Sequence, residues 1–182
     1  LTVSTLAYDR RSMRYELVDT PCGMPNGGMV REYTMGLSTA DAQYVLAGTV
    51  AGELVVFNVE ANVYRATVPL TGHGVLAMAL HPVTGELFVG GGDGMIRKVA
   101  GNDMSWAVQN EVKVRGRVVS LSMSPDGVEM LAGTDAGYVY RVLTEDLGVS
   151  QYSSSHVRPV SAVAFGSRSD VFATCGADGR VC

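Results

Sequence analysis

Long hydrophobic runs are missing from this 182-residue chain. No apolar stretch approaches the roughly 18 residues that a membrane-spanning helix requires. Charged residues are also few, at 18% of the chain, and the formal net charge of −4 leaves no broad basic field to attract nucleic acid or anionic lipid. The start, Leu1-Thr2-Val3, lacks the basic and apolar segments of a signal peptide. We therefore expect neither nucleic acid nor membrane among the partners.

Cysteine and histidine are scarce as well. The three cysteines are Cys22, Cys175 and Cys182. Their spacing fits neither a metal site nor a disulfide framework, so we expect a reducing compartment, either the cytoplasm or the nucleus. The three histidines (His73, His81 and His156) show no metal-ligand spacing either. We expect no metal and no cofactor.

Glycine is abundant instead, at 22 residues, and it marks an internal repeat. Four segments share an apolar run, a tight turn and a second apolar run: YVLAGTVAGELVVFNV from Tyr44, LFVGGGDGMIRKVA from Leu87, EMLAGTDAGYVYRVL from Glu129 and VFATCGADGRVC from Val171. Their turn glycines, 42, 43 and 42 residues apart, are Gly52, Gly94, Gly137 and Gly179. A tight turn needs positive φ, which glycine adopts freely, so each segment predicts a β-hairpin.

Two further strands complete each repeat. An apolar strand is predicted before each hairpin, over Val75–Leu80, Val118–Met123 and Val160–Phe165, with a weaker one near Tyr33–Leu37. A more polar outer strand follows, over Val63–Pro69, Ser105–Val114 and Val149–Ser153. A small residue lies four positions before each turn glycine, which permits close packing of sheets: Gly48, Gly90, Gly133 and Cys175. Four antiparallel strands in about 42 residues are typical of a β-propeller blade.

The repeat also predicts the domain organisation. We expect an all-β chain with blades at 33–70, 71–114 and 115–153 and an incomplete blade at 154–182, all in one propeller domain. Residues 1–32 would end a preceding blade, with strands over Leu1–Asp9 and Ser12–Asp19 and a long loop over Thr20–Gly28. The repeat runs to both ends of the chain, so we expect an excerpt of a longer protein and an arc of about four blades.

Other repeat architectures fit less well. A helical repeat would show an apolar stripe with a period of 3.6 residues, which is absent, and a leucine-rich repeat has a shorter period. A kelch propeller is the nearest alternative, because VGGGDG at Val89–Gly94 has paired glycines. That doublet does not recur, and kelch repeats are nearer to ~50 residues long.

The chain resembles the WD-repeat family at specific residues. That family carries a Gly-His pair before the inner strand and an aspartate in the tight turn, which hydrogen-bond within the blade. Gly72-His73 with Asp93, and His156 with Asp178, match this pattern. The Trp-Asp pair is absent, since the Trp positions hold Phe57, Val99 and Val142, and Arg115-Gly116 replaces the Gly-His pair of the middle repeat. The resemblance implies blade-stabilising hydrogen bonds for His73, Asp93, His156 and Asp178.

The four hairpin segments in this order also resemble the second propeller of a narrower group, the cilia- and flagella-associated WD-repeat proteins. The resemblance covers roughly Val30 to Cys182. It implies a structural role in the cytoskeleton of the cilium or flagellum, inside the doublet microtubules of the axoneme. The implied partners are tubulin and neighbouring microtubule inner proteins.

The residues give little support for catalysis. Asp93, Asp135 and Asp178 could serve as acid–base carboxylates, but they recur at the repeat period, and turns favour aspartate for its local backbone bonds. The run Gly90–Gly94 lacks the lysine and the following helix of a phosphate-binding loop. A propeller enzyme would need polar inner strands, whereas the predicted ones carry no charge. We therefore expect no enzyme.

A non-catalytic protein-binding scaffold is the expected function. In YDRRSMRY, Tyr8 and Tyr15 flank Arg10, Arg11 and Arg14, residue types favoured at protein interfaces, and an acidic partner such as tubulin would suit them. Trp106 in the outer strand is a second candidate contact. The alternative for the arginine and tyrosine residues is an ordinary solvated hairpin turn. The alternative for Trp106 is packing within the outer strand. An adaptor subunit of another complex, such as a ubiquitin-ligase receptor or a vesicle coat, is the alternative function.

Overall fold

The computed structural model describes residues 2–21, 31–152 and 156–182, and these residues form an all-β fold. Three four-stranded antiparallel sheets and two two-stranded sheets follow one another along the chain. This confirms the predicted fold class. The predicted loop over Thr20–Gly28, the side chain of Cys22 and the end of the strand predicted over Val149–Ser153 lie wholly or partly outside the described residues.

The strand bounds agree closely with the sequence pattern. The first full sheet contains β3 (Tyr33–Ser38), β4 (Tyr44–Thr49), β5 (Glu53–Asn58) and β6 (Val63–Pro69). The second contains β7 (Val75–Leu80), β8 (Leu87–Gly91), β9 (Met95–Asn102) and β10 (Ser105–Lys113). The third contains β11 (Val118–Met123), β12 (Glu129–Thr134), β13 (Val139–Leu143) and β14 (Val149–Gln151). The last sheet pairs β15 (Val160–Phe165) with β16 (Phe172–Gly176).

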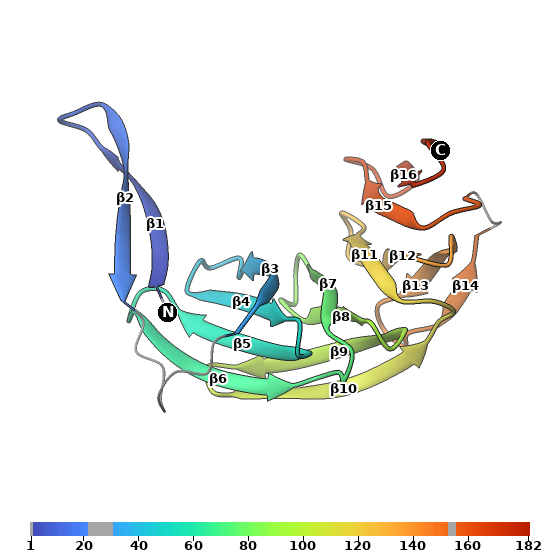
Figure 1. Cartoon of the computed structure of the whole chain (residues 1–182), viewed down its shortest axis with the longest axis horizontal. Helices are drawn as coiled ribbons and strands as arrows, with labels where there is room; N and C mark the ends of the chain where they lie inside the picture. The colour runs from blue at the N-terminus through green and yellow to red at the C-terminus, as the bar shows by residue number, and fades with distance from the viewer. Residues whose placement is uncertain (1, 22–30, 153–155) are drawn as a thin grey trace.

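The sheets lie side by side along an arc (Figure 1). The first strand of each sheet (β3, β7, β11 and β15) lies on the inner side of the arc, and consecutive first strands contact one another. Side-chain bonds join these inner strands: Thr34 Oγ1 donates to the carbonyl of Val75 at 2.6 Å, and Ser120 Oγ accepts from the N–H of Val163 at 3.0 Å. The arc is thus held together between sheets as well as within them.

The core consists of layers between neighbouring sheets, because each sheet is apolar on both faces. Leu46, Leu54 and Val56 of the first sheet pack on residues of the second, such as Val75 and Leu87. Between the second and third sheets, the buried cluster includes Phe88, Ile96, Met130, Ala132 and Val142. A smaller cluster, Leu131, Val139, Val160 and Val163, joins the third sheet to β15. The middle sheet therefore buries both faces.

Glycines set the close approach of these sheets. Gly48, in β4, faces Val75: a Cβ built on the glycine would lie 2.5 Å from Val75 Cγ1. Gly90 faces Val118 Cγ1 at 2.5 Å in the same way, and Gly133 faces Val160 Cγ1 at 2.6 Å. The valine stands beside a β-bulge each time, since the pairing register shifts just after it in β7, β11 and β15. The same contact, a glycine in the second strand of one sheet against a valine in the first strand of the next, thus recurs along the fold.

A separate hairpin stands apart from the arc in Figure 1. It consists of β1 (Thr2–Asp9) and β2 (Arg14–Pro21), paired from Thr2 with Pro21 to Asp9 with Arg14. The turn between them contains Arg10 and Arg11, as the sequence indicates. Assignment of this hairpin to a preceding blade stays a prediction.

Candidate protein-interaction site

Each sheet has two ends with different chemistry. In a four-stranded antiparallel sheet, the turn between the first and second strands and the turn between the third and fourth lie at one end. We call this end the groove edge. The turn between the second and third strands lies at the other end, together with the connection to the next sheet, and we call that end the glycine edge.

The predicted turn glycines lie on the glycine edge and take left-handed backbone conformations. Their φ angles are +88° at Gly52, +74° at Gly94, +84° at Gly137 and +76° at Gly179. Gly52 also leaves no room for a side chain, because its Cβ would lie 1.7 Å from the carbonyl oxygen of Thr71 in the connection to the next sheet. Glycine is therefore needed at these turns for its positive φ angle. At Gly52 it is also needed because there is no space for a side chain.

His156 and Asp178 are brought together on the glycine edge. The Nδ1 atom of buried His156 lies 3.0 Å from Asp178 Oδ1, and its Nε2 atom lies 2.9 Å from Thr174 Oγ1. A neutral imidazole fits this arrangement, since Nδ1–H can donate to the carboxylate while Nε2 accepts from the hydroxyl. Thr174 was not anticipated, although the signal was present: the equivalent positions hold Ala47, Val89 and Ala132, so this is the single repeat with a hydroxyl there.

The same contacts lower the pKa of Asp178. Burial by itself would raise the pKa of this carboxyl group. The hydrogen bond from His156 and the backbone N–H groups of Val157 and Arg180 outweigh burial and bring the pKa to about 2. The ionised aspartate is thus part of the folded structure.

His73 and Asp93 are not brought together. The ring of His73 is exposed, and Asp93 instead pairs with Arg97, whose Nη2 lies 2.7 Å from Asp93 Oδ2. In the next sheet Asp135 accepts from Arg117, with Nε to Oδ2 at 2.8 Å. Asp93 and Asp135 therefore each accept from an arginine, whereas Asp178 accepts from a histidine. A guanidinium has several donors in a fixed fork and reaches the carboxylate from a different strand position, which the Gly-His pattern does not predict.

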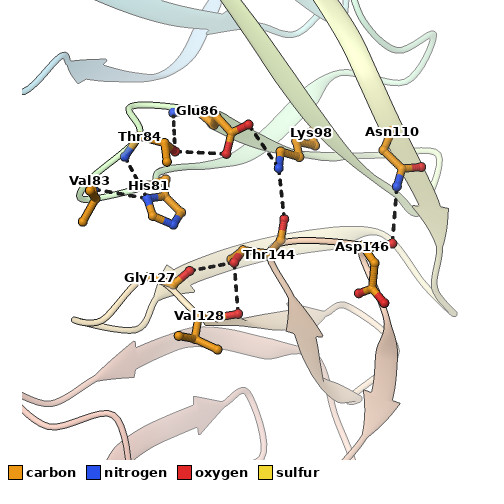
Figure 2. Close-up of polar contacts among 10 residues, drawn as sticks. All are labelled: His81, Val83, Thr84, Glu86, Lys98, Asn110, Gly127, Val128, Thr144 and Asp146. Carbon is orange, nitrogen blue, oxygen red and sulfur yellow. Dashed lines mark hydrogen bonds and ion pairs between the residues drawn. The ribbon is translucent and has the colours of Figure 1, made fainter.

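A groove lies between the second and third sheets on the groove edge, and Figure 2 shows some of its lining residues, among them His81 and Asp146. Its volume is about 370 Å³, and its lining includes His81, Asp126, Val128, Glu145 and Asp146. His81 Nδ1 accepts the N–H groups of Val83 and Thr84 at 3.1 and 3.0 Å, which fixes the ring in its turn. The Nε2 side of the ring faces the third sheet, where a Cβ on Gly127 would lie 2.6 Å from Nε2.

Polar bonds also cross this boundary between sheets (Figure 2). Lys98 Nζ, in β9, donates to the carbonyl of Thr144 at 3.2 Å and pairs with Glu86 at 3.1 Å. The Thr144 hydroxyl lies 2.6 Å from the carbonyl of Gly127 and 3.0 Å from that of Val128. These bonds fix the position of Thr144, which lines the floor of the groove. The pair of Lys98 with Glu86 recurs 43 residues later as Arg141 with Glu129, whereas Thr144 follows no repeat pattern and is not singled out by the sequence.

Carboxylates dominate the rim of this groove. Asp126 accepts from the Ser124 hydroxyl at 2.6 Å, and this bond, with those from Ser169 and the Val128 N–H, lowers the pKa of Asp126 to about 2. Glu145 and Asp146 are exposed beside it. The rim is therefore negatively charged throughout the physiological pH range.

An equivalent groove lies between the first and second sheets. Its volume is about 330 Å³, and it is lined by Asp41, Tyr44, Val83, Asp103 and Trp106, among others. Trp106 is partly buried: it packs against the apolar layer below, and its Nε1 donates to the carbonyl of Asp103 at 3.1 Å. Trp106 is thus both a packed outer-strand residue and a wall of the groove, so the two alternatives predicted for it are not exclusive.

The two edges differ sharply in charge. The loops of the groove edge carry one basic side chain with a permanent charge, Arg168, against these carboxylates: Asp41, Glu60, Glu86, Asp103, Asp126, Glu145, Asp146 and Asp170. The loops of the glycine edge carry Asp93, Asp135 and Asp178 against Arg115, Arg117, Arg158 and Arg180. The net negative charge of the chain is therefore concentrated on the groove edge.

The β1–β2 hairpin presents the other predicted contact residues. Tyr8 and Tyr15 lie opposite one another on one face with ring centroids 5.0 Å apart, and they are 44% and 67% exposed. Leu6 and Leu17 extend this apolar face, and both are about two-thirds exposed. Arg10, Arg11 and Arg14 are exposed around the turn. The hairpin therefore combines an apolar strip with a basic tip.

Among residues 2–21, 31–152 and 156–182, no group of three or more histidine, cysteine or acidic side chains is arranged to hold a metal ion. The described part of the chain also contains no helix with the length and apolar character needed to cross a membrane.

Known proteins share both the repeat and the fold. The family model "WD domain, G-beta repeat" matches residues 64–98 and 149–182. Cilia- and flagella-associated protein 52 of Chlamydomonas reinhardtii is 28% identical over 157 residues, which is 82% of this chain and 25% of that protein. Its counterpart from Sus scrofa is 26% identical over 152 residues, covering 81% of this chain and 24% of that protein. The chain thus spans about a quarter of the length of these curated relatives.

A solved structure shows the same architecture. Chaetomium thermophilum Sqt1, bound to the N-terminus of the ribosomal protein L10, superimposes with a TM-score of 0.78 at 18% identity over 99% of this chain and 52% of that one. At this identity the likeness concerns the fold alone. Together with the repeated sheets and the matched repeats, it shows that the chain has the all-β architecture of a β-propeller and carries WD repeats over residues 64–98 and 149–182.

Proposed function

We propose that this protein is a non-catalytic, structural component of the doublet microtubules of cilia or flagella. The observation that carries the proposal is the similarity to cilia- and flagella-associated protein 52, which extends over about four-fifths of the chain in two distant organisms. The similarity runs through whole sheets, so it is not confined to one repeat. WD-repeat propellers bind other proteins, and the exposed surfaces of this chain suit that role.

The proposed partners are tubulin and neighbouring microtubule inner proteins. The exposed guanidinium groups of Arg10, Arg11 and Arg14 suit an acidic protein surface, and the adjacent tyrosines supply apolar area. The hairpin stands clear of the arc, so a partner can reach it without disturbing the sheets (Figure 1).

Co-sedimentation of the full-length protein with salt-washed axonemes and with purified microtubules tests the proposal. We expect retention in at least the axoneme pellet, and loss of retention after Arg10→Glu and Arg11→Glu. Arg168→Glu is the matched control, because Arg168 is also exposed but lies on the groove edge, paired with Asp170. Absence of binding to both axonemes and microtubules contradicts the proposal.

The alternative is an adaptor subunit in another assembly, such as a ubiquitin-ligase receptor or a vesicle coat. Affinity purification from ciliated cells separates the two. Recovery of ligase or coat subunits without cytoskeletal proteins would favour the adaptor, whereas recovery of tubulin and axonemal proteins supports the ciliary role.

A further inference from the structure

We propose that the groove between the first two full sheets binds an arginine-containing segment of a partner protein. The walls of this groove are Tyr44 from the first sheet and Trp106 from the second. A second hollow of about 210 Å³ adjoins it and shares Thr39, Ala40, Pro82 and Gly85 with it. Together they form a short furrow across the boundary between the sheets.

The aromatic wall favours a planar cation. Trp106 is held in position by its bond to the Asp103 carbonyl, and Tyr44 donates from its hydroxyl to Asp103 Oδ1 at 3.2 Å. A fixed indole is the strongest cation–π partner among protein side chains, and guanidinium stacks on aromatic surfaces more readily than ammonium. The groove thus favours arginine over lysine.

Two carboxylates in the groove retain a free oxygen. The recorded bonds of Asp103 go to Oδ1, which receives the Tyr44 hydroxyl and lies 2.9 Å from Arg65 Nε. Those of Asp41 also go to Oδ1, from the Thr39 hydroxyl and the N–H of Gln43. Among the described residues, no hydrogen bond is found at the Oδ2 atom of either aspartate. A guanidinium donates along several directions, so an arginine on Trp106 suits these acceptors.

The surroundings select a protein segment as the occupant. Val83 lines the groove and is 80% exposed, and apolar side chains next to the arginine would cover it. The loops of the groove edge carry eight carboxylates and one arginine, so this edge attracts a basic segment and repels nucleic acid and anionic lipid. A volume of about 330 Å³ suits one or two side chains of an extended peptide.

This inference rests on the proposed function in one respect: both assume that the partner is a protein. The groove and the ciliary assignment can fail separately. Binding of the peptide without binding of axonemes supports the proposed groove and contradicts the ciliary role. Binding of axonemes without binding of the peptide contradicts the proposed groove alone.

The chain contains a single tryptophan, Trp106, so its fluorescence reports on this groove directly. The probe is a short peptide of alternating arginine and valine, titrated into the full chain. We expect a saturable change in Trp106 emission and a matching rise in the anisotropy of the labelled peptide. The corresponding lysine peptide should bind several-fold more weakly, and a glutamate peptide should not bind.

Paired variants separate the groove from the general charge of the edge. Asp41→Asn with Asp103→Asn should weaken binding about tenfold, since two charge-assisted bonds are lost. Glu145→Gln with Asp146→Asn removes the same charge from the same edge but at the other groove, and should change affinity less than about twofold. Equal weakening by both pairs overturns the proposal, as does binding that leaves Trp106 emission unchanged. Unchanged circular dichroism of both pairs ensures that loss of binding is not loss of fold.

Discussion

Gly90 in β8 lies directly against Val118, the first residue of β11, so closely that a Cβ on the glycine would lie 2.5 Å from Val118 Cγ1. The contact joins the second and third sheets through backbone and methyl groups. Two more glycine–valine pairs, Gly48 with Val75 and Gly133 with Val160, repeat it at the other boundaries. The separation of the sheets therefore depends on a missing side chain.

Gly90→Ala should destabilise the chain by about 1–3 kcal/mol, because the added methyl group forces the sheets apart. The midpoint of urea unfolding, followed by circular dichroism, measures the effect. Gly72→Ala is the matched control: nothing lies within 4 Å of a Cβ at Gly72, and its φ is not left-handed. Equal unfolding midpoints for the two variants would show that the close approach is not a constraint.

Acid should weaken the contact between His156 and Asp178. The pKa of Asp178 is lowered in the folded chain from 3.8 to about 2, so the ionised form is favoured on folding. Its contribution to stability is present above about pH 4 and is lost as pH falls through about pH 2. Thermal unfolding between about pH 5 and about pH 2 should show a smaller decline for Asp178→Asn than for the unaltered chain. Parallel curves would show that this aspartate does not contribute to the acid response.

Arg97→Gln should destabilise the second sheet, because Asp93 loses both of its side-chain bonds to the guanidinium. Hydrogen bonds to charged groups contribute about 1.5–3 kcal/mol, and the side chain of Arg97 is only 11% exposed. Arg180→Gln serves for comparison, since Arg180 lies in an exposed turn. A loss of stability no greater than that of Arg180→Gln would mean that Arg97 does not replace the histidine structurally.

Thr144→Val should cost about 1–2 kcal/mol, because the buried hydroxyl contacts the carbonyls of Gly127 and Val128. Thr84→Val is the comparison, since that hydroxyl bonds to Glu86 in an exposed turn. Urea unfolding of both variants measures the difference. If the two substitutions prove equally mild, Thr144 does not support the floor of the groove.

Backbone geometry was predictable here because it repeats. The turn glycines and the apolar runs specify the hairpins, and residues such as Gly90 already indicate close packing four positions before each turn. Side-chain partners were less predictable, because they depend on which strand faces which. His156 reaches Asp178, but Asp93 takes Arg97 from its own hairpin, and the two residues are only four apart in sequence. Tyr44 and Asp103 meet in the groove although they lie 59 positions apart, and no local motif marks such a pair.

The layered core, in which apolar side chains from adjacent sheets meet, has a consequence for cooperativity. In the described residues, the main contacts between sheets join those that are consecutive along the chain, so the array behaves as a one-dimensional chain of coupled units. The second sheet, β7–β10, is flanked on both sides, and its amides should exchange with solvent most slowly. Opening should then propagate inward from the outer sheets, and a substitution at one boundary should divide the arc into two segments that unfold at different denaturant concentrations.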